Sequence, residues 1–386
     1  MEVSLLTGGI DPHYAFGLAT ALTAKSISLD VIGSDAVDSP EMHATRGLRF
    51  LNLQRTLPAT AGFARRAWEV LAFYVRLLRY TTTTKAKVFH ILWNNKLQFC
   101  DRTVLMLYHK LLGKKIVFTA HNVNAGKRDS ADTVLNRLTL KAQYRLADHI
   151  FVHTEPMKAE LIGEFGVRKE AVTVIPYGIN NCVPDTTLTP GEAKRRLGIA
   201  EHQQTLLFFG RIGPYKGLEL LATAFQETGH PDRRLIIAGT TKEGSEDYLS
   251  DILRKLREQA DRGLVLSRVQ YIPDRDIELY FKAADAVVLP YTQIYQSGVL
   301  FLAYSFGVPV IASDVGSFRE DVVEGQTGFL CKPCDAADLA RAIESYFGSE
   351  LYRHLDERRQ AIRDYANQRH SWDVVGQMTR DVYAAL

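Results

Sequence analysis

The sequence predicts an α/β protein built from two doubly wound, Rossmann-like parallel-sheet domains that face a cleft. Strand-like apolar segments alternate with helical patterns through most of the 386 residues, which is typical of a parallel sheet covered by helices on both faces. The alternation stops at 179–190, a stretch rich in Asn, Thr and Pro, and starts again at Thr205. A chain of this length, with 46% hydrophobic residues, can bury two cores of that kind.

In the first half, six strand-like segments are separated from one another by helical patterns. Short apolar runs indicate the strands, and longer runs with a 3.6-residue period indicate the helices. The expected strands are Val3–Leu6, Leu29–Ile32, Val88–Trp93, Lys115–Thr119, Ile150–His153 and Val172–Ile175. The expected helices lie near Tyr14–Ala24, Phe63–Tyr80, Asp101–Leu112, Ala131–Tyr144 and Pro156–Phe165.

The second half repeats the pattern. Leu218, Leu221, Ala222 and Phe225 recur at helical spacing, which predicts a helix laid on a sheet. The segment Val299–Phe306 is apolar nearly all round and is expected to be a buried helix that Gly307 caps. The expected strands are Thr205–Phe209, Leu235–Ala238, Val269–Ile272, Ala286–Leu289 and Val308–Ala312.

Composition excludes several classes of protein. A net charge of +3 argues against a dedicated nucleic-acid binder, and four cysteines give no disulfide framework, which fits a reducing cytosol. The N-terminus starts as a strand without a basic leader, so no secretory signal is expected. No apolar stretch approaches the roughly 20 residues of a membrane span. We expect a cytoplasmic protein that is soluble or peripheral on the cytoplasmic face of a membrane.

The turn after strand Thr205–Phe209 has the features of an anion site. Gly210 and Gly217 bracket a turn that leads into a helix, where backbone N–H groups and the helix dipole favour negative charge. Arg211 and Lys216 lie inside this turn. Most basic loop residues are simply solvated, but two cations beside such amides suit a pyrophosphate.

A second anion site is expected where the buried helix begins, at Gln296, Ser297, Gly298 and Val299. The free N–H groups of its first turn and the Ser297 hydroxyl can bind phosphate oxygens without a metal. An ordinary helix cap would use the same residues, and the two interpretations are compatible.

Two loops of the first half follow strands in the same way. Gly8 and Gly9 link a strand to a helix start, so the backbone can approach a ligand closely, although such a pair is often only a tight turn. His121 follows strand Lys115–Thr119. Its imidazole can hydrogen-bond a sugar hydroxyl, relay a proton, or cap strand-end carbonyls.

In their order along the chain, these motifs resemble the nucleotide-sugar glycosyltransferases of the GT-B type, in particular the retaining group 1 and family 4 enzymes. The resemblance also covers residues 145–154, Ile175–Gly178 and the block from Pro309. It implies transfer of a sugar from a UDP- or GDP-linked donor to a glycan or lipid-linked acceptor, in cell-surface polysaccharide or glycoconjugate synthesis. No cofactor is implied.

The resemblance also assigns domains and residues. It gives an acceptor-side domain at 1–178, a linker at 179–203, a nucleotide-sugar domain at 204–368 and a tail helix at 369–386 that crosses back to the first domain. Arg211 and Lys216 would stabilise the leaving diphosphate, and His121 would line the sugar side of the cleft. The donor-binding residues would be Gly8, Gly9, Gly210, Ile272, Gln296, Ser297, Gly298, Val299 and Glu320.

The chain departs from the family at two positions. Relatives carry a pair of glutamates that contact the donor sugar and the ribose, whereas this chain has Ile294 and Leu302 there. The donor sugar must be held otherwise, with Gln293, Gln296 or Glu320 as candidate substitutes, and the retaining stereochemistry is open.

No metal site is expected. Cys331 and Cys334 have CxxC spacing, but a structural zinc site needs two further ligands that the sequence does not offer. No acidic pair stands at a strand end, so the donor diphosphate is expected to bind without Mg²⁺ or Mn²⁺.

The segment Phe63–Tyr80 combines four arginines with aromatic and aliphatic residues. A helix of this kind can lie in an anionic membrane interface, and a core helix with a basic outer face is equally compatible with the pattern. Lys110, Lys114 and Lys115 would add to the positive side.

Two other functions remain open. A non-hydrolysing nucleotide-sugar epimerase would use the same fold, whereas a phosphorylase would need a longer chain. The missing glutamates would also fit a non-catalytic partner of another transferase, although Arg211 and Lys216 argue against it.

Overall fold

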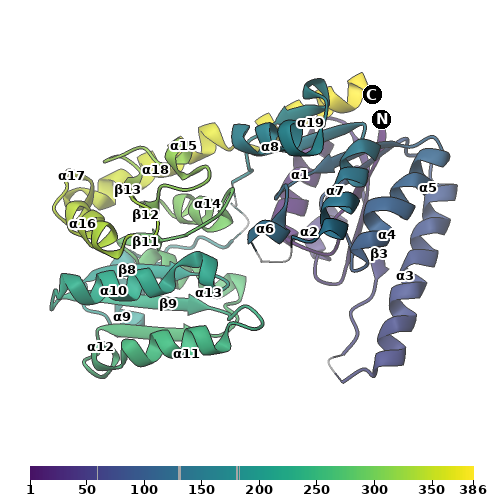
Figure 1. Ribbon diagram of the computed structural model, residues 1–386. Coiled ribbons are helices and arrows are strands. Elements are labelled where there is room, and N and C mark those ends of the chain that lie inside the picture. Colours follow the sequence, from purple (N-terminus) through teal and green to yellow (C-terminus); the bar gives the residue numbers. More distant parts are fainter. Residues whose placement is uncertain (59, 129–131, 180, 182) are drawn as a thin grey trace. The chain divides into compact units, whose positions relative to one another are not determined.

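Two parallel sheets organise the chain, each covered by helices (Figure 1). The computed structural model describes residues 1–58, 60–128, 132–179, 181 and 183–386. Unit 1 comprises Met1–Gly178 together with His370–Leu386, and unit 2 comprises Ile179–Arg369. This architecture confirms the expected fold class.

The sheet of unit 1 has seven parallel strands in the order β3-β2-β1-β4-β5-β6-β7. The direction in which the chain adds strands reverses between β1 and β4, and ligands bind at the carboxyl ends of strands beside such a reversal. The strands are β1 (Glu2–Leu6), β2 (Ser28–Ser34), β3 (Leu48–Gln54), β4 (Val88–Ile91), β5 (Lys115–Thr119), β6 (His149–Val152) and β7 (Val172–Val174).

The helices of unit 1 cover this sheet, and the C-terminal helix α19 is one of them. Trp372, at the start of α19, packs so closely on Gly17 and Gly178 that a Cβ atom at either glycine would overlap its ring. The helices are α1 (Pro12–Ala24), α2 (Pro40–Ala44), α3 (Phe63–Thr83), α4 (Gln98–Cys100), the π-helical turn η1 (Asp101–Leu105), α5 (Met106–Leu111), α6 (Ala125–Arg128), α7 (Val134–Leu146), α8 (Glu155–Phe165), the 3-10 turn η2 (Lys169–Ala171) and α19 (Trp372–Ala385).

The sheet of unit 2 has six parallel strands in the order β10-β9-β8-β11-β12-β13, with the reversal between β8 and β11. The strands are β8 (Gln204–Phe209), β9 (Arg233–Gly239), β10 (Val265–Val269), β11 (Ala286–Leu289), β12 (Val310–Ser313) and β13 (Gly328–Cys331). The helices are α9 (Pro190–Arg196), the 3-10 turn η3 (Pro214–Lys216), α10 (Leu218–Thr228), α11 (Glu246–Lys255), α12 (Arg257–Asp261), α13 (Asp274–Ala283), α14 (Gly298–Ser305), α15 (Phe318–Asp321), α16 (Ala336–Phe347), α17 (Glu350–Arg353) and α18 (Leu355–Arg369).

The segment expected as a linker, 179–203, contains a folded helix. Thr189 and Glu192 form a reciprocal capping box that starts α9. In this helix, the Lys194 ammonium forms a buried ion pair with Asp285, at 2.9 Å, next to β11. Residues 190–203 are therefore part of unit 2, because local capping and this ion pair fasten them to its sheet.

Several expected boundaries differ from the structure. β10 lies at Val265–Val269 rather than at Val269–Ile272, and neither β3 at Leu48–Gln54 nor β13 at Gly328–Cys331 was expected. All three are edge strands with partly exposed side chains, and none shows a long continuous apolar run. The expected helix from Ala131 starts outside the described residues, and its described part is α7.

Candidate functional site

The predicted anion turn of unit 2 follows β8, at the reversal of strand order. Gly210 and Gly217 both adopt positive φ, 103° and 64°. A Cβ atom at Gly217 would lie 2.0 Å from the carbonyl oxygen of Pro290, so only glycine lets this turn pack on the loop after β11. The main-chain N–H of Thr292 bonds the Tyr215 carbonyl at 2.9 Å across the same contact.

Within this turn, the Lys216 side chain is buried and the Arg211 side chain is exposed. Lys216 is 5% exposed, and its Nζ lies 3.4 Å from the Phe209 carbonyl oxygen and 5.3 Å from the centre of the Tyr291 ring. Arg211 is exposed and bonds no residue that the structure describes. The turn thus offers one cation fixed by packing and one that is open to a ligand.

The start of α14 lies against the same turn. A Cβ atom at Gly210 would be 3.4 Å from the Val299 side chain and 3.0 Å from the Lys216 ammonium. The Ser297 hydroxyl does not cap α14 and lies 3.5 Å from the Tyr291 hydroxyl. The first-turn N–H groups of α14 therefore have no side-chain cap, as binding of an anion would require. The structure brings the two predicted anion elements together.

The other predicted donor-binding residues of unit 2 lie in several settings. Gly298 is exposed at the start of α14, and Ile272 is buried in the loop between β10 and α13. The Gln296 Oε1 atom is buried and has no hydrogen-bond partner among the described residues. Glu320 is an exposed residue of α15. Of the candidates, Gln296 alone presents a buried polar atom that still needs a partner.

The two positions where the resemblance implies glutamates carry apolar side chains. Ile294 is half-buried, and a Cβ atom at Gly316 would lie 2.2 Å from its carbonyl oxygen. Leu302 is a 7% exposed core residue of α14. Neither side chain can accept a hydrogen bond from a donor hydroxyl.

In unit 1, His121 lies in an aromatic enclosure after β5. Its imidazole stacks on the Trp93 indole, with ring centres 4.2 Å apart, and meets the Tyr14 ring edge-on at 4.6 Å. Tyr177 closes a further side at 6.1 Å. The pKa of His121 lies well below its usual value. Burial is the main cause, and the neighbouring His153 is the second. The ring is therefore neutral at pH 7.

The hydrogen bonds of His153 determine the tautomer of His121. A carbonyl oxygen only accepts, so the bond of 3.2 Å from His153 Nδ1 to the Ile175 carbonyl places a proton on that nitrogen. Burial lowers the pKa of His153 to about 4, so its Nε2 is bare and accepts from His121 Nδ1 at 3.0 Å. His121 Nε2 is therefore an acceptor, and it has no partner among the described residues.

This nitrogen is shielded from solvent, so a hydroxyl group reaches it only after a side chain of the enclosure moves. A buried acceptor without a partner costs about 1–3 kcal/mol, which a ligand hydroxyl would recover.

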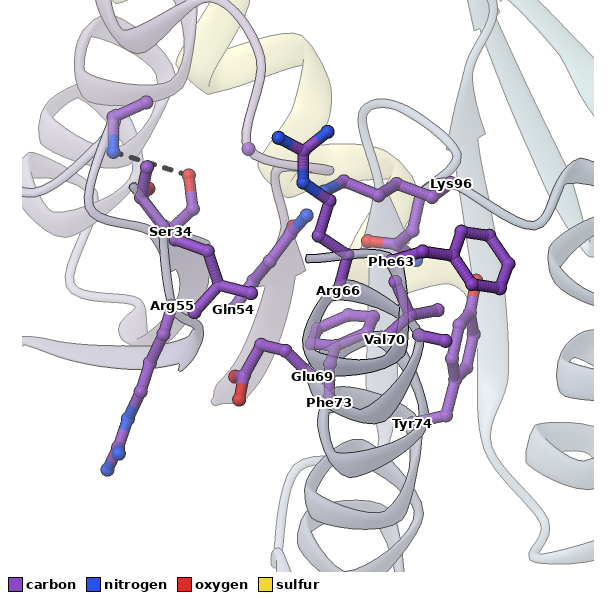
Figure 2. A pocket seen from close by; sticks show the side chains of 16 residues that line it. Ser34, Gln54, Arg55, Phe63, Arg66, Glu69, Val70, Phe73, Tyr74 and Lys96 are labelled. Carbon is purple, nitrogen blue, oxygen red and sulfur yellow. Dashed lines mark hydrogen bonds between the residues drawn. The ribbon is translucent and has the colours of Figure 1, made fainter. Parts of the chain in front are cut away.

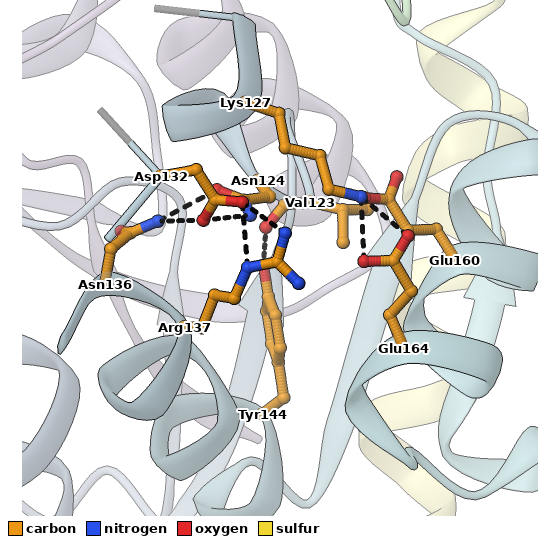
Figure 3. A network of polar contacts seen from close by, with 9 residues as sticks. All are labelled: Val123, Asn124, Lys127, Asp132, Asn136, Arg137, Tyr144, Glu160 and Glu164. Atoms are coloured by element: carbon orange, nitrogen blue, oxygen red, sulfur yellow. Dashed lines mark hydrogen bonds and ion pairs between the residues drawn. The ribbon is translucent and has the colours of Figure 1, made fainter. Parts of the chain in front are cut away.

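A polar network fastens the loop that carries His121 (Figure 3). Asn124 donates to Asp132 at 2.9 Å and accepts from Asn136 at 2.9 Å, and the Tyr144 hydroxyl donates to the Val123 carbonyl at 2.5 Å. On its other side, Lys127 bridges Glu160 and Glu164 of α8. The His121 loop is thus tied to α7 and α8.

The Gly-Gly loop packs where β1, β2 and β4 end. Gly8 and Gly9 have φ of 62° and 71°. A Cβ atom at Gly8 would lie 2.8 Å from the Trp93 carbonyl oxygen, and one at Gly9 would lie 2.8 Å from the Ser34 hydroxyl. Both positions require glycine for close packing.

Gly9 also lines a pocket of about 660 Å³ between the carboxyl edge of the sheet and the start of α3 (Figure 2). Its polar wall comes from strand ends and the loops after them, and its apolar wall comes from α3. The lining residues are Gly9, Ser34, Ala36, Gln54, Arg55, Thr56, Leu57, Phe63, Arg66, Ala67, Glu69, Val70, Phe73, Tyr74, Asn95 and Lys96.

Little in the sequence indicates this pocket. Gln54 ends β3, the unexpected edge strand, and Asn95 and Lys96 lie in the loop after β4. Only the sheet order brings these loops together with α3, and strand order is not visible in a single sequence. The Arg66 and Tyr74 side chains were noted only as parts of a basic, aromatic helix.

The two cysteines with CxxC spacing do not form a disulfide or a metal site. Cys331 is buried, and burial raises the pKa of its thiol to about 12, whereas Cys334 is exposed. Within the described ranges, no group of three or more His, Cys, Asp or Glu side chains could hold a metal ion.

Two family models match the chain. Residues 191–369 match the model described as Glycosyl transferases group 1, and residues 12–181 match Glycosyltransferase Family 4. The two matched ranges coincide with most of unit 2 and of unit 1, respectively.

The chain is also similar to curated sugar-transferring enzymes in sequence and to solved structures in fold. A D-inositol 3-phosphate glycosyltransferase of Corynebacterium aurimucosum is 27% identical over 70% of this chain and 66% of its own length. A Mycobacterium tuberculosis glycogen synthase is 30% identical over 70% of this chain and 63% of its own length. The chain thus spans no more than about two thirds of these relatives. The Anabaena protein Alr3699/HepE, solved with UDP and glucose, matches over 100% of both chains with a TM-score of 0.77 and 18% identity.

Proposed function

Since the chain belongs to the group 1 glycosyltransferases of the GT-B fold, we propose that it transfers a sugar from a nucleotide-sugar to a glycan or lipid-linked acceptor. The observation that carries the proposal is the meeting of the Gly210–Gly217 turn with the uncapped start of α14, around the buried Lys216. A UDP- or GDP-linked donor fits this proposal, and the UDP bound in the Anabaena structure favours UDP.

The proposed chemistry places the donor diphosphate on this turn. As the bond between sugar and β-phosphate breaks, negative charge grows on the phosphate oxygens. Lys216 and the N–H groups at the start of α14 are already oriented, so they stabilise that charge without reorganising. Arg211, which is exposed, would close on the same group. These donors supply the charge stabilisation without a metal or organic cofactor.

The sugar end of the donor would be held by residues other than the missing glutamates. In unit 2, Gln296 Oε1, which has no partner among the described residues, can accept from a donor hydroxyl. In unit 1, His121 Nε2 can accept from a sugar hydroxyl. We propose retention of configuration at the transferred carbon, as in the family. NMR of the first-formed product, before the sugar mutarotates, reads the configuration directly.

A donor screen tests the function. UDP-, GDP- and ADP-sugars are compared for their ability to raise the melting temperature, because a ligand that binds only the folded state stabilises it. The donor that stabilises the protein is then supplied with membrane extract or glycan, in EDTA and in Mn²⁺. Transfer that survives EDTA supports the proposal. An isomerised nucleotide-sugar as the product would instead identify an epimerase, and a requirement for Mn²⁺ would refute the metal-free mechanism.

We further propose that unit 1 docks on the cytoplasmic face of an anionic membrane, where a lipid-linked acceptor for cell-surface polysaccharide or glycoconjugate would be presented. On α3, Phe73 and Leu77 face the core, while Phe63 and Trp68 are 87% and 67% exposed. Exposed apolar side chains continue onto the neighbouring helices η1, α5 and α7. On these neighbouring helices they are Val104, Leu107, Leu111, Val134, Leu135 and Leu138, and α3 itself adds Leu71 and Val75.

The charge on this face is smaller than the sequence indicated. Lys110 pairs with Asp148 at 2.8 Å, and Lys114 donates to the carbonyl oxygens of Thr84 and Ala86. These lysines serve the fold and are not available to lipid. The exposed arginines of α3 provide the remaining attraction. Within the described residues, no helix is long and apolar enough to cross a membrane.

Liposome co-sedimentation tests the docking. Trp68→Glu with Leu71→Glu should abolish binding to vesicles that contain phosphatidylglycerol, and added salt should weaken binding of the wild type. The control is Val269→Glu, an exposed apolar residue of β10 in unit 2, which should bind as the wild type does. Equal, negligible binding by all three proteins would leave a soluble acceptor as the better interpretation.

A further inference from the structure

The pocket of unit 1 carries an excess of positive charge. Three of its lining residues are cations, Arg55, Arg66 and Lys96, and one is an acid, Glu69. Glu69 forms an ion pair with Arg76 of the same helix, which neutralises it. The charge left in the pocket is therefore positive.

Two of the three cations are suited to a shared ligand. Arg66 and Lys96 come from different elements, the first turn of α3 and the loop after β4, and both side chains are exposed. Arg55 extends away from them in Figure 2. The pKa of Asp35 is lowered, mainly because its carboxylate accepts a hydrogen bond from the Thr56 main chain. The positive charge of Arg55 contributes a smaller part.

Neutral donors and acceptors surround these two cations. Gln54 and Asn95 line the pocket beside the Ser34 hydroxyl. The Asn95 amide is held by Asp101, which accepts from it at 3.2 Å and from the Tyr74 hydroxyl at 2.9 Å. Amides and hydroxyls of this kind bind the hydroxyl groups of a sugar or polyol.

The opposite wall is apolar and comes from α3, through Phe63, Val70, Phe73 and Tyr74. A volume of about 660 Å³ is far larger than an inorganic anion needs and accommodates a sugar ring with a substituent. An inorganic anion would use the cations alone and leave the amides and the aromatic wall without a role.

From the charge, the amides and the size together, we infer that this pocket binds a phosphoryl group attached to a sugar or polyol, with Arg66 and Lys96 on the phosphate oxygens. Guanidinium forms paired hydrogen bonds with phosphate, and ammonium adds a point charge. The inference rests on the proposed function in one respect, since it makes this phosphorylated group part of the acceptor. A soluble sugar phosphate and a phospholipid headgroup share this chemistry.

Binding is measured by calorimetry, without a donor, so that the result does not depend on turnover. Hexose 6-phosphate is the probe, and the neutral hexose is its comparison. Arg66→Glu and Lys96→Glu should each weaken hexose-phosphate binding at least about tenfold. Arg79→Glu is the matched control, because Arg79 is an exposed arginine of the same helix that does not line the pocket. It should bind within twofold of the wild type.

Two further tests complete the experiment: an uncharged variant that fills the pocket, and binding to lipid vesicles. Ala67→Trp fills the pocket without changing its charge and should abolish binding while the melting temperature stays near that of the wild type. If soluble hexose phosphate fails to bind, vesicles of phosphatidylinositol in phosphatidylcholine are used. A loss of vesicle binding in Arg66→Glu and Lys96→Glu that clearly exceeds the loss in Arg79→Glu then assigns the pocket to a lipid headgroup, since Arg79 shares only the general attraction of α3 to anionic lipid.

The inference is overturned if the neutral hexose binds as tightly as the phosphate, or if binding of both probes is unaffected by Arg66→Glu and Lys96→Glu. Melting with UDP- and GDP-sugars is recorded on the same protein samples. If the protein binds hexose phosphate but no nucleotide-sugar, the proposed transfer is contradicted and the inference about the pocket stands. If the protein binds a donor and transfers its sugar but does not bind either phosphorylated probe, the pocket inference is contradicted and the proposed transfer stands.

Discussion

Replacing His153 tests whether it sets the proton of His121. His153 makes two bonds, a donation of 3.2 Å to the Ile175 carbonyl and an acceptance of 3.0 Å from His121 Nδ1. His153→Asn places an amide N–H near the position of Nδ1 and removes the acceptor. His153→Gln places an amide oxygen near the position of Nε2 and removes the donor. The two variants therefore separate the two bonds.

The expected losses of stability are similar for the two variants. His153 is 6% exposed, so each variant leaves one buried polar group without a partner, at a cost of about 1–3 kcal/mol. The tautomer of His121 responds differently. With Gln the proton stays on His121 Nδ1 and Nε2 remains an acceptor, whereas with Asn nothing holds the proton there. We expect the Gln variant to retain most of the turnover and the Asn variant to lose about tenfold, the equivalent of one hydrogen bond.

The assay is nitrogen-15 NMR of the imidazole rings, which separates a bare ring nitrogen from a protonated one, together with kcat and KM. The wild type and the Gln variant should show a bare Nε2 in His121, and the Asn variant a mixture. A purely structural role would lower turnover in proportion to stability and leave the tautomer unchanged. A protonated Nε2 in the wild type, or equal tautomers in the Asn and Gln variants, would refute the reasoning.

Two other predictions follow from buried groups. Burial lowers the pKa of His90 to about 3 and those of His109 and His153 to about 4, so the unfolded chain binds more protons below pH 6.5. Stability of unit 1 should be full above pH 6.5 and fall by about 1.4 kcal/mol per pH unit for each of these histidines as the pH drops towards 4. The three tryptophans all lie in unit 1, so urea unfolding followed by their fluorescence reads it, and a constant midpoint from pH 7 to 5 would contradict the prediction. In unit 2, Gly239→Ala should cost about 3 kcal/mol or more by calorimetry, because its Cβ would lie 2.0 Å from the Gly210 carbonyl oxygen. Gly244→Ala, at φ 77° in open space, should cost only about 1 kcal/mol, and equal losses would show that crowding at Gly239 is not the cause.

All the interior strands were predicted, and one edge strand, β7, was predicted with them. β1, β8 and β11 have neighbours on both sides and read as continuous apolar runs, since both faces are covered. The strands that were missed or displaced, β3, β10 and β13, are at sheet edges, where one side has no partner and the side chains are partly exposed. Edge strands give a weak pattern, because less of their surface must be apolar.

The candidate site divides in the same way. The Gly210–Gly217 turn and the start of α14 were predictable, because glycine and helix-start signals are local in sequence. Their contact through Tyr291, and the pairing of His121 with His153, join residues that are distant in the chain. The pocket beside α3 depends on strand order, which a single sequence does not contain.

The central claim is that Lys216 stabilises a leaving nucleoside diphosphate. Lys216→Met keeps an unbranched apolar side chain and removes the ammonium, which lies beside Gly210; Lys255→Met, at an exposed position of α11, is the control. Transfer is measured with the donor that the screen identifies. The account predicts a fall in kcat of about 100- to 1,000-fold for Lys216→Met, with a much smaller change in donor affinity and an unchanged melting temperature. A folded Lys216→Met protein with a kcat within threefold of that of Lys255→Met would contradict it.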